Sequence, residues 1–139
     1  MMETDFYGAY QRHWRDAEYL YTDSRLANAD QLYGYSAECG LKCLMQCFGM
    51  PLNPVTENPP KKDRVHIDQA WDRYEAYRSG IGAAGYTLPQ PNPFSEWHIS
   101  HRYTHTSRFS QIYVDQHRAG AMMVRVLINK AILEGKLII

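Results

Sequence analysis

Residues 29–48, ADQLYGYSAECGLKCLMQCF, decide the fold. Apolar and small residues recur there at the three- and four-residue steps that bring side chains to one face of an α-helix. This face consists of Tyr33, Ala37, Gly40, Leu41, Leu44 and Phe48. Its small members would let a neighbouring helix approach closely. The segment therefore predicts a long amphipathic helix packed inside an all-helical protein.

Three other stretches have the same helical period. The predicted helices run from about Phe6 to Leu26, from Asn28 or Asp30 to Gly49, from about Asp63 to Gly80, and from about Thr106 onward. Thr4 or Asp5 is expected to cap the first, and Asn28 or Asp30 the second. Gly49 and Pro51 are expected to terminate the second helix. The short 25–28 connection predicts an antiparallel hairpin.

These observations define the predicted fold class. The expected fold is all-α, an antiparallel four-helix up-and-down bundle with a long Gly/Pro-rich loop, residues 80–95, before the last helix. The chain has 139 residues, which suits a single domain, residues 1–139, around one hydrophobic core.

Composition argues against several partners. Lysine plus arginine total 15 and aspartate plus glutamate total 15, so no overall charge attracts nucleic acid or anionic lipid. The N-terminal residues MMETD lack the basic start and apolar run of a signal peptide, and no stretch is apolar for long enough to cross a bilayer. We therefore expect a soluble cytoplasmic protein with no membrane partner.

Three patterns that suggest a cofactor or metal are better explained without one. Residues 80–85, GIGAAG, match the dinucleotide-binding pattern, but a helix precedes them and prolines follow, whereas that site needs a strand before it and a helix after it. Cys39, Cys43 and Cys47 follow one straight helix, which rarely brings ligands together. A triad of histidines, 98, 101 and 105, has no carboxylate beside it except Glu96. We predict neither cofactor nor metal.

Charged pairs at helical spacing are a separate feature. Glu38 and Lys42 are four residues apart, as are Arg12 and Asp16, and the simplest expectation for both pairs is an exposed ion pair. The alternative is a shared polar network between the first two helices, in which every group must be satisfied.

The chain resembles the HEPN domain family in three segments. These are RHWRDAE at 12–18, YGYSAECGLK at 33–42 and WHISHRY at 97–103. The resemblance implies a small four-helix homodimer of prokaryotic toxin–antitoxin or defence systems. It also implies association with RNA or a nucleotide, and in many members a minimal nucleotidyltransferase as partner.

Ribonucleases of that family carry an arginine, four to six intervening residues and a histidine near the start of the last helix. No arginine of this chain is followed by a histidine at that separation. A non-standard, metal-independent site remains open, because Arg102 and His105 are three apart and would share a helical face if the last helix starts early. Tyr103 could then stack on a base.

Three functions remain open from the sequence. The first, which we favour, is a homodimeric binding module. The second is a ribonuclease with Arg102, His105 and Tyr103 as candidate catalytic residues. The third is a small-ligand protein that holds a nucleotide near Trp97 and Trp71. Candidate ligand- or RNA-binding residues are Arg102, Arg108, His117, Arg118 and Trp97.

Overall fold

The computed structural model of the protein describes residues 2–139, which form four α-helices and contain no strand. The helices are α1 (Phe6–Thr22), α2 (Leu26–Cys47), α3 (Ile67–Gly80) and α4 (Gln111–Leu133). Short 3-10 helices occupy the connections: η1 (Lys61–Asp63), η2 (Ala84–Tyr86), η3 (Ile99–Tyr103) and η4 (Thr106–Arg108). The all-helical class predicted from the sequence is confirmed.

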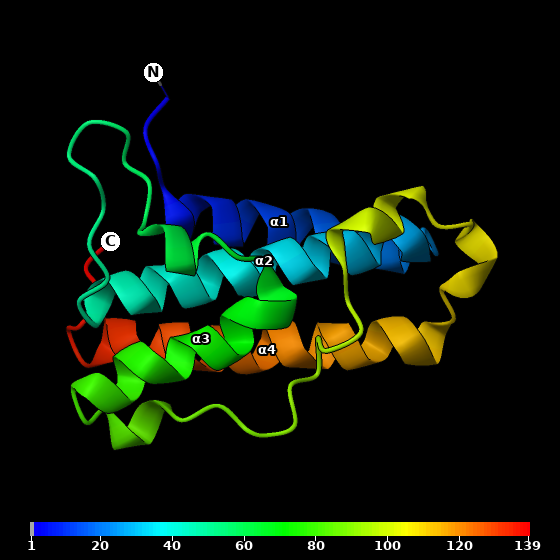
Figure 1. The fold of residues 1–139 in the computed structure, drawn as a ribbon. Helices are drawn as coiled ribbons and strands as arrows, with labels where there is room; N and C mark the ends of the chain where they lie inside the picture. Colours follow the sequence, from blue (N-terminus) through cyan, green and yellow to red (C-terminus); the bar gives the residue numbers. More distant parts are fainter. Residues whose placement is uncertain (1) are drawn as a thin grey trace.

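Helix α2 is the centre of the structure. It contacts α1, α3 and α4, and Figure 1 shows it between the α1 and α4 layers. Most of its residues from Ala29 to Met45 are buried, as three neighbouring helices require. Gly40 of α2 makes this packing possible, because it lies against Val124 of α4 and Tyr10 of α1.

The relative directions of the helices follow from their side-chain contacts. Tyr21, near the end of α1, bonds to Asp115 near the start of α4, so these two helices are antiparallel. Asp30 and His117 pair near the starts of α2 and α4, so this pair runs in the same direction.

The antiparallel α1–α4 pair and the parallel α2–α4 pair agree with the predicted up-and-down alternation, but this prediction is wrong for α3. His66, just before α3, bonds to Glu38 in the middle of α2. Tyr74 of α3 contacts Phe48 at the end of α2, so α3 runs in the same direction as α2. The predicted α1–α2 hairpin does form, and Figure 1 shows the two helices running in opposite directions. The physical reason for the difference is the 48–66 connection, which carries the chain back to the middle of α2 before α3 begins. The long 81–110 connection then returns the chain to the end of the bundle where α2 begins (Figure 1).

Two predicted helix termini are confirmed. Asp5 caps α1, since its Oδ1 accepts a hydrogen bond of 2.8 Å from the Gly8 amide. Gly49 follows α2 with φ of +108°, a left-handed conformation that glycine adopts without strain.

The other termini differ from prediction by several residues. Helix α1 ends at Thr22 because Ser24 turns the chain with φ of 60°, and α2 then starts at Leu26. Asp30 thus lies inside α2 and caps nothing. Helix α4 begins at Gln111, where the Ser110 hydroxyl caps the Tyr113 amide.

The Gly/Pro-rich loop is anchored to the core by aromatic side chains. Phe94 and Trp97 are fully buried, and Trp71 donates its indole N–H to the Pro89 carbonyl at 3.2 Å. The Trp97 indole lies directly on Gly34 of α2. This contact fixes where the loop crosses α2 before α4 begins.

Replacing Gly34 by alanine tests this close approach. A Cβ at Gly34 would lie under 3.0 Å from three atoms of the Trp97 ring, so either the indole or the helix must move. We expect Gly34→Ala to lower the free energy of unfolding by about 1–3 kcal/mol, the usual cost of overpacking a core, as measured by urea unfolding.

The matched control is Gly80→Ala at the end of α3, where nothing lies within 4 Å of the added Cβ. That substitution should be neutral or stabilise the protein by up to about 1 kcal/mol through helix propensity. Equal effects at the two glycines would contradict the packing described.

Candidate functional site

The candidate catalytic residues predicted from the sequence lie in η3 and η4, just before α4. Arg102 and Tyr103 are exposed at the end of η3, and the guanidinium lies 4.8 Å above the Tyr103 ring. His105 is also exposed, but its Nδ1 caps η4 by accepting from the Ser107 amide at 3.1 Å. Because α4 starts only at Gln111, Arg102 and His105 lie in separate 3-10 turns and do not share a helical face.

Three of the candidate binding residues form hydrogen bonds with other residues of the protein. Trp97 is 1% exposed and donates its indole N–H to the Asp30 carbonyl at 3.3 Å. Arg118 binds both carboxylate oxygens of Glu18, with its Nη2 at 2.9 Å, and lies over the Tyr21 ring. Packing thus covers the Trp97 ring, whereas Arg118 is paired with Glu18 but keeps 40% of its side chain exposed.

His117 is the third of these residues, and it is fully buried. Its Nδ1 lies 2.5 Å from Oδ1 of Asp30, and both side chains are at most 1% exposed. The ring stacks on Phe94 and meets the edge of Tyr113, with ring centroids 5.1 and 4.8 Å away. Burial therefore removes His117 from the predicted exposed basic patch, whereas Arg102 and Arg108 are exposed.

Asp30 is the polar residue that the sequence analysis placed wrongly. Burial raises the pKa of its carboxyl, and the hydrogen bond with His117 partly offsets that rise. Its second oxygen, Oδ2, and the Nδ1 of His101 are buried with no hydrogen-bond partner among the described residues. One sequence signal pointed to this role, since Asp30 is in helical register with Tyr33 and Ala37 on the apolar face.

A second polar cluster surrounds Lys42. Its Nζ lies 3.0 Å from Oε2 of Glu38, and the two side chains are only 9% and 13% exposed. The other oxygen of Glu38 bonds to Nδ1 of His66 at 2.9 Å, which raises the pKa of that histidine. The expectation of an exposed Glu38–Lys42 pair is wrong, because the segment before α3 covers it.

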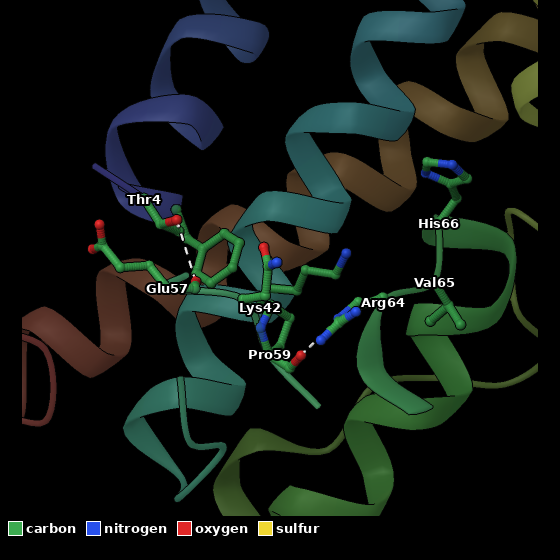
Figure 2. Close-up of a pocket in the computed structure, with 9 residues that line it drawn as sticks. Thr4, Lys42, Glu57, Pro59, Arg64, Val65 and His66 are labelled. Carbon is green, nitrogen blue, oxygen red and sulfur yellow. Dashed lines mark hydrogen bonds between the residues drawn. The ribbon is translucent and has the colours of Figure 1, made fainter. Parts of the chain in front are cut away.

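A pocket of about 300 Å³ opens beside Lys42. Figure 2 shows it between the start of α1, the middle of α2 and the segment that leads to α3. Its lining consists of Thr4, Phe6, Lys42, Glu57, Asn58, Pro59, Arg64, Val65 and His66. Two of the four residues with ionisable side chains, Lys42 and Arg64, carry fixed positive charge.

The proposed network between Arg12, Asp16, Glu38 and Lys42 forms only in part. Arg12 and Asp16 are exposed and make no ion pair with each other among the described residues. Glu38 instead bridges Lys42 and His66. His66 was missing from the sequence analysis because it lies far from both residues along the chain.

The cysteines and histidines were also considered as metal ligands. Within residues 2–139, no group of three or more His, Cys, Asp or Glu side chains is placed to hold a metal ion. All three cysteines are free thiols. The hydrogen bond from Cys43 lowers the pKa of Cys47 to about 7, whereas burial raises the pKa of Cys39 to about 12.

Helix α4 also presents an exposed apolar row. Its members are Ile112, Ala119, Val126 and Leu133, which follow one another at intervals of seven residues. Ile112, Val126 and Leu133 are 80%, 63% and 87% exposed. Met122 and Met123 flank the row and are also exposed. We call these six residues the α4 row.

Comparisons with protein-family models, curated proteins and solved structures find no match for this chain. The resemblance to HEPN domains stays a prediction. No helix formed by residues 2–139 has both the length and the apolar character needed to cross a membrane. Three features of the structure bear on function: the α4 row, the buried Asp30–His117 pair and the Lys42 pocket.

The His66–Glu38 bond predicts a pH-dependent contribution to stability. The folded-state pKa of His66 is raised above its ordinary value of 6.5, so the contribution is complete below 6.5 and disappears as pH rises through the folded-state value. His66→Gln should destabilise the protein more at low pH than at high pH, by less than about 1 kcal/mol because the ring is half exposed.

The measurement is urea unfolding of the wild type and of His66→Gln, at a pH below 6.5 and at a pH above the folded-state pKa of His66. Glu38→Gln should remove the same pH dependence, because the carboxylate is its cause. An unfolding difference between wild type and His66→Gln that stays constant across this range would contradict the assignment.

Proposed function

We propose that the protein is a HEPN-like homodimeric binding module in which α4 packs against α4 of a second copy. The α4 row carries this proposal. Apolar side chains at seven-residue intervals form the seam by which two helices pack together. A row of exposed apolar side chains on a small domain is characteristic of an interaction site.

The chemistry of the row favours a second copy of this chain as the partner. In a two-fold dimer the same surface patch faces itself, so charged residues in it would meet like charges. The α4 row contains no charged residue, and it extends from Ile112 at the first turn of α4 to Leu133 at the last. Self-association therefore buries apolar area without placing like charges opposite each other.

The HEPN assignment within this proposal is supported by the positions of the resembling segments. Residues 12–18 lie on α1 and residues 33–42 lie on α2, and these two helices pack together. Residues 97–103 form the entry to α4. As part of the proposal, the module acts in the cytoplasm within a toxin–antitoxin or defence system, with a minimal nucleotidyltransferase as a possible partner.

RNA or nucleotide association within this proposal would use the exposed cations near the start of α4. Arg102 stacked on Tyr103 offers a positive charge beside an aromatic face, and Arg108 is exposed on the neighbouring turn. Stacking and charge together are the usual means of holding single-stranded RNA.

The two alternative functions are less well supported. A ribonuclease using Arg102, Tyr103 and His105 needs the histidine near the arginine, whereas His105 is held by Ser107. A nucleotide site walled by Trp97 and Trp71 needs exposed indole rings, and each of these is 1% exposed. Neither residue set is in the arrangement that its chemistry requires.

A charge placed in the middle of the α4 row tests the dimer. Val126→Glu would bring two carboxylates together across a two-fold axis, so we expect the variant to be monomeric. Light scattering during gel filtration should give twice the 16.2 kDa chain mass for the wild type and the single mass for the variant.

The control is Ala76→Glu, which adds the same charge to an exposed position of α3 and should leave the dimer intact. A wild-type protein that stays monomeric at high concentration, or a Val126→Glu variant that stays dimeric, would refute this arrangement.

A further inference from the structure

The Lys42 pocket has the size and walls of a small-molecule site. Its volume of about 300 Å³ lies at the lower end of the range for ligand pockets. Three parts of the chain that are distant in sequence build it: residues before and within the first turn of α1, Lys42 of α2, and the segment 57–66 with its residues 57–59 and 64–66. Phe6, Pro59 and Val65 supply apolar surface, and the polar groups come from Lys42, Arg64 and His66.

Lys42 is a buried ammonium with spare hydrogen-bond donors. Its side chain is 9% exposed, and the only partner of Nζ among the described residues is Oε2 of Glu38. An ammonium group has three N–H donors, and leaving donors of a buried charge unpaired is costly. An acceptor in the pocket would therefore complete the hydrogen bonding of Lys42.

Arg64 contributes the second fixed positive charge. Its Nε donates to the Pro59 carbonyl at 2.9 Å, which orients the guanidinium, and no carboxylate of residues 2–139 pairs with it. Figure 2 shows Lys42 and Arg64 reaching the same side of the pocket, while the Glu57 carboxylate points away from them. The outer N–H groups of Arg64 remain available to a ligand.

The local charge balance favours an anion. Lys42 and His66 share the single carboxylate of Glu38, and the hydrogen bond to Glu38 favours the protonated form of His66. Arg64 adds a charge that no acidic side chain neutralises. The cationic side of the pocket thus holds more positive than negative charge.

We infer that this pocket binds a small phosphate monoester, with Lys42 and Arg64 holding the phosphate and Phe6, Pro59 and Val65 contacting its organic part. A guanidinium matches the spacing of phosphate oxygens through paired N–H donors, and a lysine supplies a compact charge. The volume of about 300 Å³ accommodates a small phosphorylated molecule. This site is separate from the α4 row and does not depend on the dimer.

Three probes distinguish the parts of this inference in calorimetric titrations of the wild-type protein at constant ionic strength. Phenyl phosphate has a phosphate and an apolar ring. Orthophosphate has the phosphate without the ring, and benzoate has the ring with a carboxylate in place of the phosphate. We expect phenyl phosphate to bind most tightly, orthophosphate more weakly and benzoate most weakly. No saturable binding of phenyl phosphate, or benzoate binding as tightly, would overturn the phosphate assignment.

The substitution Arg64→Gln tests whether Arg64 holds the phosphate. Arg64 is exposed, so its replacement should leave the thermal midpoint without ligand nearly unchanged while weakening phenyl phosphate binding about tenfold or more. The matched control is Lys61→Gln, which removes an exposed positive charge nearby but outside the pocket lining and should preserve binding. Equal affinities for the Arg64→Gln variant and the wild type would overturn the assignment.

Discussion

The hydrogen bond between Asp30 and His117 is the constraint on which the other features of the structure depend. It joins the start of α2 to the start of α4 at a distance of 2.5 Å, inside a cluster formed by Phe94 and Tyr113. A buried carboxylate that loses its partner remains uncompensated in a medium of low polarity. The bond therefore fixes the parallel alignment of α2 and α4 and requires the long 81–110 connection to return along the bundle.

The same constraint decides which residues are free for function. The Trp97 indole binds the Asp30 carbonyl and packs on Gly34, so the segment before α4 is held by its aromatic residue. Arg118, one residue after His117, is directed to Glu18 of α1. The outer face of α4 is left uncovered, because α1 and α2 already occupy its inner side. The α4 row and the Lys42 pocket are among the surfaces that remain accessible.

Local interactions made part of the fold predictable from sequence. The apolar period of α2, the Asp5 cap and the Gly49 terminator each depend on neighbours within a few residues. The direction of α3 was not predictable in this way, because it depends on where the 48–66 connection returns along α2.

The candidate site was harder to predict, because burial of a polar residue depends on its partner. His117 and Arg118 have the composition of a basic surface, and only the positions of Asp30 and Glu18 draw them inward. Glu38 and Lys42 have the spacing of an exposed pair, yet residues 57–66 cover them. Sequence patterns describe one element at a time, whereas these contacts join separate elements.

A double-mutant cycle on Asp30 and His117 tests the central claim most directly. Asp30→Ala and His117→Leu should each lower the free energy of unfolding by about 3–5 kcal/mol, because each leaves the other polar group buried alone. The double variant should be more stable than the sum of the two losses implies, with a coupling energy of about 2 kcal/mol or more. Losses that add to within about 0.5 kcal/mol would show that the two side chains do not act as a pair.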